Sequence, residues 1–189
     1  MFCLRRPPPS TIARFLDRSQ DLPLSYGPIR MLETTTRRLD EQTVTIGRGS
    51  TDFERATREL GAWTHFALGW VELFPRGASI EPGTTVAVLI RHMGFWSLNG
   101  CRVLYHVQDD TRFGFAYGTL PNHAEAGEEL FVVEFNPVTD AVTYRIRAVS
   151  WPYALPAHIG QPIVRHLQER FRRDSAAAMT RAVGLKAVL

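Results

Sequence analysis

The stretch Arg112–Phe135, RFGFAYGTLPNHAEAGEELFVVEF, decides the fold because it contains two strand patterns joined by a short link. Phe113, Phe115 and Tyr117 are every second residue, and Phe131, Val133 and Phe135 repeat that spacing. A period of two is typical of a strand with one buried face. Parallel neighbours need a long crossover, so a link over residues 122–127 favours antiparallel pairing. We therefore predict a curved antiparallel sheet with one buried face.

Similar patterns flank this pair and extend the predicted sheet to about seven strands. The strands are expected at residues 34–46, 70–74, 84–91, 101–108, 112–119, 129–135 and 142–150. The links between the later strands are short and contain Gly, Pro, Asn and Asp, the usual turn formers. Antiparallel order therefore holds for most of the sheet.

Three helices complete the prediction. A short one follows Ser10 and runs to about Ser19, and a second follows the capping box Thr51-Asp52-Phe53-Glu54 and runs to about Thr64. The third is long and C-terminal, with an apolar stripe that includes Val164, Leu167 and Phe171. A curved antiparallel sheet wrapped around a long C-terminal helix is an α+β, helix-grip arrangement. We expect residues 1–33 to form an N-terminal extension and residues 34–189 a single domain.

Composition excludes several classes of protein. The 189 residues are 44% hydrophobic with a net charge of +3, which does not fit a disordered chain. The charge comes from arginine, because Lys186 is the only lysine among 22 basic residues. The sequence shows no apolar run of membrane-spanning length and no secretory signal, and Cys3 and Cys101 have no CxxC partner. We expect a cytoplasmic, bacterial protein with reduced thiols.

Several segments also resemble a known family, DUF1990, a domain of unknown function. The resemblance is carried by residues 114–121, His123, residues 127–129 and Phe131, with support from residues 47–49, Trp63, residues 101–103 and residues 168–171. Two positions depart from the family pattern: Asn122 replaces a usual glycine, and Trp151 replaces a usual arginine. The family is similar to the START-like, birch-pollen-allergen-like (SRPBCC) superfamily. That resemblance implies a helix-grip fold that encloses hydrophobic ligands, and in some members a cyclase, dehydratase or hydrolase.

The link between the two central strands carries the candidate chemistry. His123 beside a carboxylate such as Glu129 could act as a general acid or base on a bound ligand. The structural alternative is that Glu128 or Glu129 accepts backbone N–H bonds or pairs with Arg102. Alternation separates Glu128 from Glu129, so only one of the two can point inward.

A pocket lined by aromatic rings with a few polar groups is the expected ligand site. The candidate ligand-binding residues are Arg102, Tyr117, Tyr105, Trp63, Phe115 and Trp151. No metal is expected because the histidines lack HxxxH or HExxH spacing. No cofactor is expected either: Gly47-Arg48-Gly49 lacks the third glycine of a dinucleotide fingerprint.

Three functions remain open at this point. The first is binding of an apolar or aromatic small molecule between the sheet and the C-terminal helix. The second is an enzyme in that cavity, with His123 and a glutamate transferring protons. The third is an interaction module that uses the arginines of the C-terminal helix. Nucleic acid is not an expected partner, because acidic residues balance two of those arginines and no RNA-binding motif is present.

Overall fold

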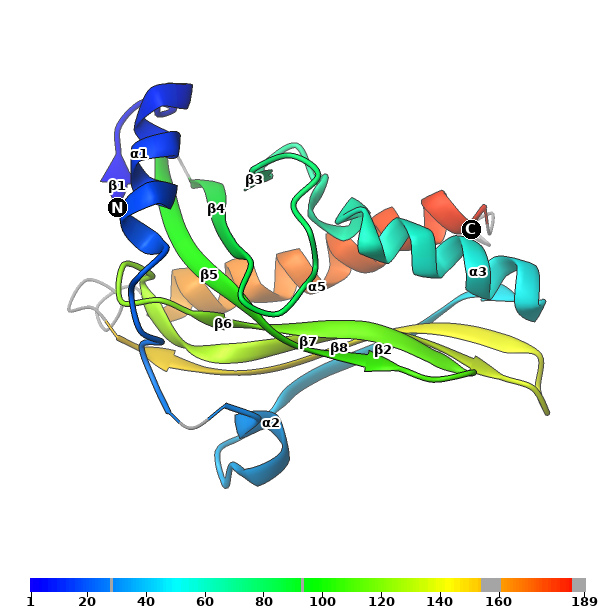
Figure 1. Ribbon diagram of the computed structural model, residues 1–189. Helices are drawn as coiled ribbons and strands as arrows, with labels where there is room; N and C mark the ends of the chain where they lie inside the picture. Colours follow the sequence, from blue (N-terminus) through cyan, green and yellow to red (C-terminus); the bar gives the residue numbers. More distant parts are fainter. Residues whose placement is uncertain (28, 93, 154–160, 185–189) are drawn as a thin grey trace.

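The computed structural model describes residues 1–27, 29–92, 94–153 and 161–184, and the side chains of residues 161–163 lie outside this description. Figure 1 shows a strongly curved sheet with helices on both faces. The strands are β1 (Phe2–Cys3), β2 (Asp40–Arg48), β3 (Val71–Phe74), β4 (Thr85–His92), β5 (Phe95–Gln108), β6 (Arg112–Thr119), β7 (Glu125–Asn136) and β8 (Ala141–Pro152). The helices are α1 (Pro9–Ser19), α2 (Met31–Thr34), α3 (Gly49–Gly61), the 3-10 turn η1 (Thr64–Phe66) and α5 (Gln161–Val183).

The sheet is antiparallel, with seven strands in the order β2-β8-β7-β6-β5-β4-β3. The two-residue strand β1 pairs with β5 outside this path. Irregular pairing interrupts the ladder between Thr45 and Gly47 and between Val103 and Tyr105. Bulges of this kind bend strands and increase their twist. The predicted helix-grip class, a curved sheet around a long C-terminal helix, is confirmed.

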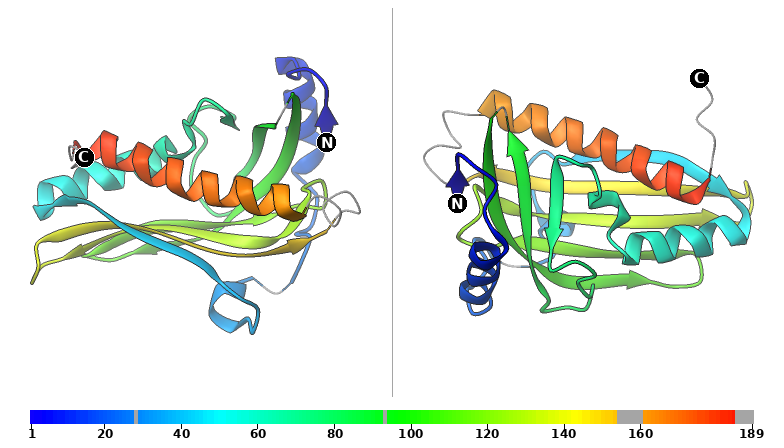
Figure 2. Two further views of the ribbon diagram at one scale, coloured as in Figure 1. Left: turned by 180° about the vertical axis from the view of Figure 1, so that it is seen from behind. Right: turned by 90° about the horizontal axis from the view of Figure 1, so that it is seen from above.

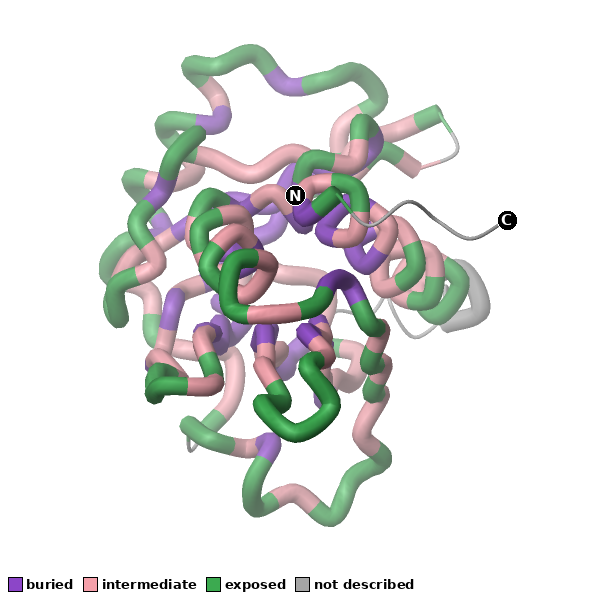
Figure 3. Tube along the Cα trace, turned by 90° about the vertical axis from the view of Figure 1, so that its right-hand side faces the viewer, coloured by how far each residue is buried: buried purple, intermediate pink, exposed green. Residues whose placement is uncertain are grey.

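The concave face of the sheet holds the main core. Figure 2 shows α5 lying across this face beside α3. Phe115, Phe131 and Tyr144 of the sheet are buried against Leu60 of α3 and Met179 of α5. In Figure 3 many of the buried segments of the trace lie toward the middle of the molecule, with exposed segments around them. The alternation read from the sequence therefore selects the buried face of β6 and β7 correctly.

The convex face is covered by the N-terminal segment. Ile12 of α1 is buried against Leu89 of β4 and Leu98 of β5, and α2 packs on β7 and β8. Residues 1–33 thus contact the sheet through β1, α1 and α2.

The predicted capping box is wrong, because α3 begins at Gly49 rather than after Thr51. Gly49 has a φ of +76°, a conformation that suits glycine at the corner between strand and helix. The carboxylate of Asp52 instead accepts a 2.9 Å hydrogen bond from the backbone N–H of Arg48. Asp52 thereby satisfies a free donor at the helix start, as a capping side chain does.

Three strand starts differ from prediction by four residues or more. The first long strand starts at Asp40 rather than residue 34, because Thr34 ends the helical turn α2 and residues 35–39 form neither helix nor strand. Strand β5 starts at Phe95 rather than Cys101. Strand β7 starts at Glu125 rather than Glu129, so residues 125–128 also belong to the strand and not to the preceding link.

Gly114 and Gly127 permit close strand pairing. A Cβ atom on Gly114 would collide with the backbone oxygen of Phe131, and one on Gly127 with the backbone oxygen of Val149. Neither oxygen can move without breaking the sheet, so only glycine fits there.

Among the described helices, none combines the length and the apolar character that crossing a membrane requires.

Candidate functional site

A cavity of about 530 Å³ lies between the sheet and α5. Its apolar lining includes Phe66 of η1, Trp70 before β3, Val88 and Ile90 of β4, and Leu167 and Phe171 of α5. The volume falls in the range of small-molecule sites, and so does a mainly apolar lining with a few polar groups.

Tyr117 and Glu129 form the first polar feature of this cavity. They are directly paired across β6 and β7, both line the cavity, and the Tyr117 hydroxyl donates a 2.7 Å hydrogen bond to Glu129 Oε2. Burial raises the pKa of Glu129 to about 7, although the Tyr117 hydrogen bond and the charge of Arg172 favour the ionised form. Glu129 can therefore gain or lose a proton near neutral pH.

A second polar group joins two strands to α5. Gln168 Nε2 donates to both oxygens of Glu125 at 3.2 and 3.0 Å and to Ser150 Oγ at 3.0 Å. Ser150 Oγ donates to Glu125 Oε1 at 3.4 Å. Burial raises the pKa of Glu125, while the bonds from Gln168 and Ser150 oppose that shift. We call Tyr117, Glu125, Glu129, Ser150 and Gln168 the polar wall.

His123 lies in the turn between β6 and β7 and also lines the cavity. Its Nδ1 accepts a 2.9 Å hydrogen bond from the backbone N–H of Glu125. Burial lowers the pKa of His123 to about 4, so the ring is neutral at pH 7. A neutral ring whose Nδ1 is an acceptor carries its proton on Nε2. His123 is therefore a hydrogen-bond donor here, and Glu129 is the better proton-transfer group.

Trp63 and Phe115 lie deeper in the core and are not part of the cavity lining. Trp63 follows α3 with a φ of 60°, donates from Nε1 to the Ala78 oxygen at 2.9 Å, and packs edge-on against Phe115 with 4.6 Å between ring centroids. Both rings are buried by other side chains, so the two residues pack the core and do not contact the cavity, contrary to prediction.

Arg102 and Tyr105 lie on the convex face, away from the cavity. Arg102 donates to the backbone oxygens of Ser19, Gln20 and Leu22 at 3.1, 2.6 and 2.8 Å, so it binds the end of α1.

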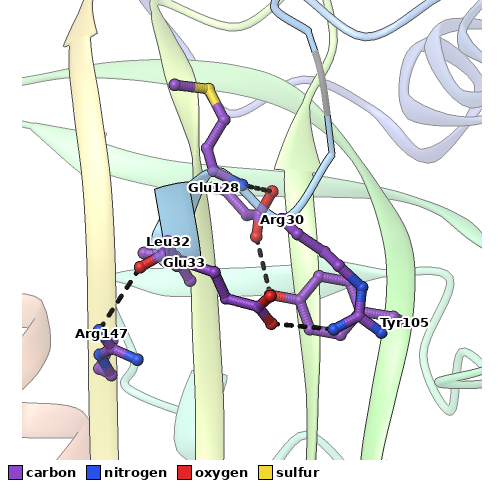
Figure 4. Close-up of polar contacts among 7 residues, drawn as sticks. Arg30, Leu32, Glu33, Tyr105, Glu128 and Arg147 are labelled. Carbon is purple, nitrogen blue, oxygen red and sulfur yellow. Dashed lines mark hydrogen bonds and ion pairs between the residues drawn. The ribbon is translucent and has the colours of Figure 1, made fainter. Parts of the chain in front are cut away.

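Figure 4 shows the neighbouring cluster under α2, in which the Tyr105 hydroxyl donates to Glu128 at 2.8 Å. The backbone N–H of Met31 donates to the same carboxylate at 3.2 Å, and the Tyr26 hydroxyl does so at 3.1 Å. The Arg30 guanidinium covers the Tyr105 ring at 4.6 Å. As alternation requires, Glu128 points outward and Glu129 inward. Glu128 therefore has the expected structural role, because its carboxylate accepts a hydrogen bond from a backbone N–H. It does not pair with Arg102, which binds the end of α1 instead.

Trp151 also lies on the convex face. Its ring meets Tyr26 edge-on at 6.0 Å, and the Arg37 guanidinium lies over it at 4.5 Å. Among the eight predicted site residues, only Tyr117, His123 and Glu129 line the cavity.

The sequence reasoning missed Glu125, Ser150, Gln168 and Arg172, which all line the cavity. Gln168 could have been found, because it is a polar residue beside the apolar stripe of the last helix. Glu125 was missed because the sequence analysis assigned residues 122–127 to the link, whereas β7 already begins at Glu125. Among the described residues, no group of three or more His, Cys, Asp or Glu side chains is arranged to hold a metal ion.

Comparison with known proteins gives consistent matches. Residues 31–178 match the family model described as a domain of unknown function, DUF1990. A UPF0548 protein of Deinococcus radiodurans is 37% identical, covering 97% of this chain and 100% of its own length. A UPF0548 protein of Dictyostelium discoideum is 30% identical, covering 97% and 96%. Because relatives occur in a eukaryote as well, similarity does not establish the expected bacterial source.

One solved structure supports the fold assignment. The Zhui aromatase/cyclase from Streptomyces sp. R1128 matches with a TM-score of 0.51 and 12% identity, covering 79% of this chain and 96% of that protein. At this identity the similarity shows a shared helix-grip architecture.

Proposed function

The chain belongs to the DUF1990 family, and we propose that it binds an apolar or aromatic small molecule in the cavity between the sheet and α5. The observation that carries the proposal is the cavity itself. A concave space of about 530 Å³ with a mostly apolar lining matches the size and character of small-molecule sites. A ligand of matching shape would remove this apolar surface from water, which is favourable.

The polar wall supports orientation of such a ligand. Its side chains come from β6, β7, β8 and α5, and hydrogen bonds between them fix their positions. Polar groups held rigidly on an apolar surface give a ligand one preferred orientation.

Titration with the neutral fluorescent probe N-phenyl-1-naphthylamine tests this function. Ala148 of β8 lines the cavity, and Ala148→Phe would fill part of it, whereas Ala13→Phe makes the same change on exposed α1. We expect saturable binding by the unchanged protein and by Ala13→Phe, with affinity at least about tenfold lower in Ala148→Phe. Equal binding by all three proteins would contradict the proposal.

Proton-transfer catalysis in the same cavity is the second candidate function. It is favoured by the Tyr117–Glu129 pair, since a cavity-facing carboxyl with a pKa of about 7 is suited to acid–base chemistry. The proton would move at Glu129, with Tyr117 holding the carboxylate in position. Incubating candidate cyclic or dehydratable substrates with the protein and with Glu129→Gln would test it, and turnover that survives Glu129→Gln would contradict it.

An interaction role for the arginines of α5 has less support. Arg170 and Arg173 lie 3.4 and 3.1 Å from the carboxylate of Asp174, and Arg172 lies 3.9 Å from that of Asp40. These three side chains therefore have acidic neighbours within the protein.

A further inference from the structure

The polar wall offers more free hydrogen-bond acceptors than donors. The Tyr117 hydroxyl already donates to Glu129, and the Gln168 amide and the Ser150 hydroxyl already donate within the Glu125 group. A carboxylate has about four lone-pair positions. A ligand that brings hydrogen-bond donors finds free acceptors in the polar wall. A ligand carboxylate would have to displace bonds within that wall or turn to His123 Nε2 and Arg172, which also line the cavity.

Of the two carboxylates in the polar wall, Glu129 is the more open. It accepts a bond from Tyr117 at Oε2, whereas Glu125 accepts from both Gln168 and Ser150. The side chain of Arg172 also lines the cavity, but its nearest acidic oxygen belongs to Asp40, at 3.9 Å. A ligand group that binds Glu129 therefore needs to displace few existing hydrogen bonds.

Several charged and titratable groups share the cavity lining with Glu129. They are Asp40 of β2, His92 of β4, Tyr117 of β6, Glu125 of β7, Arg172 of α5 and His123 in the turn before β7. The charged N-terminus also lies near enough to His123 to lower its pKa. The acidic side chains outnumber the one arginine, and His123 is neutral at pH 7. This part of the described lining therefore favours a cation.

Aromatic rings stand close to this acidic position. Phe66 contacts both Tyr117 and Phe171, with ring centroids 6.1 and 5.0 Å apart, and all three residues line the cavity. The faces of aromatic rings attract cations, and they also pack against apolar ligand bodies.

We propose that the ligand is a hydrophobic amine whose ammonium group binds Glu129 while its apolar body lies against Phe66 and Phe171. This inference rests on the proposed ligand-binding function and specifies the ligand's chemical class. Ionised Glu129 is the binding form, so amine affinity should rise with pH as Glu129 loses its proton while the amine keeps its own.

The test is calorimetric titration with three probes that share one apolar body: 4-phenylbutylamine, 4-phenylbutan-1-ol and 4-phenylbutanoate. Near pH 8 the amine should bind about tenfold more tightly than the alcohol, with the carboxylate weakest. This advantage should shrink severalfold near pH 5.5, where Glu129 is protonated.

Glu129→Gln should remove most of the amine's advantage over the alcohol. Glu54→Gln, which neutralises an exposed glutamate of α3, is the matched control and should change nothing. Circular dichroism confirms that each variant is folded. If the alcohol binds but the amine binds no better, or if the carboxylate binds best, this inference is wrong and the cavity function stands. If none of the probes binds, both fail.

Discussion

The Tyr117 hydroxyl donates a 2.7 Å hydrogen bond to Glu129 Oε2 across two paired strands, with both side chains facing the cavity. This bond stabilises the ionised carboxylate, while burial favours the protonated one. Tyr117→Phe should therefore raise the pKa of Glu129 above its value of about 7. Carbon-13 NMR titration of the glutamate carboxyl groups measures this directly. An unchanged or lower pKa would show that the bond does not favour the ionised form.

Glu129 should also make stability depend on pH. Its pKa is raised on folding from 4.5 to about 7, so the folded protein holds the proton more tightly than the unfolded chain. The contribution of Glu129 to the free energy of unfolding should thus fall as pH rises from 4.5 to 7 and then level off, whereas buried histidines such as His65 contribute in the opposite sense. Glu129→Gln should remove this contribution, so its free energy of unfolding should exceed that of the unchanged protein by a margin that grows with pH to roughly 2–3 kcal/mol near pH 8. Urea unfolding at a series of pH values tests it, and parallel pH profiles for the two proteins would contradict it.

His65 should be replaceable with a gain in stability. It is fully buried among aromatic rings, and neither ring nitrogen has a hydrogen-bond partner among the described residues. Burial lowers its pKa to about 3, so folding is destabilised as pH falls from 6.5 toward 3.

His65→Leu should raise the free energy of unfolding by about 1–2 kcal/mol at pH 7 and by more in acid, because it removes two unsatisfied polar atoms. His106→Leu is the contrasting variant. His106 Nε2 lies 2.6 Å from the Ile80 oxygen, so its loss should destabilise the protein. Thermal unfolding at pH 5 and pH 7 distinguishes the two, and a destabilised His65→Leu would overturn the prediction.

Arg102 should matter for stability and not for ligand binding. Its guanidinium binds three backbone oxygens at the end of α1, and lysine cannot reproduce that fork. We expect Arg102→Met and Arg102→Lys each to lower the free energy of unfolding by about 2 kcal/mol. Probe affinity should stay within about twofold for the folded variants. Loss of probe binding without loss of stability would contradict this prediction and would indicate that Arg102 contacts the ligand.

The sequence was sufficient for the class of fold and for part of the site. Strict alternation around Arg112–Phe135 identifies the buried face, and the short turn keeps Tyr117, His123 and Glu129 together. Short-range geometry of this kind is encoded by neighbouring residues, so it can be read from one sequence.

Outside this stretch, alternation along the strands was enough to exclude Arg102 and Trp151 from the cavity, but not Tyr105. Cys101 and Val103 face the core, so Arg102 faces outward by alternation. Continued alternation would turn Tyr105 inward, but the irregularity between Val103 and Tyr105 places it on the convex face beside Glu128. Trp151 lies outward because Tyr144 and Ile146 of the same strand face the core. A bulge depends on strand partners that a single sequence does not reveal.

Two-dimensional amide NMR during titration with 4-phenylbutan-1-ol tests the central claim most directly, because it reports where a neutral apolar ligand binds. We predict shifts concentrated at the β6–β7 turn, at residues 148–150 of β8 and at residues 164–172 of α5, all of which contribute to the cavity. The convex-face residues Arg102, Tyr105 and Trp151 should shift little. Shifts on the convex face, or no saturable shifts at all, would contradict a ligand site between the sheet and α5.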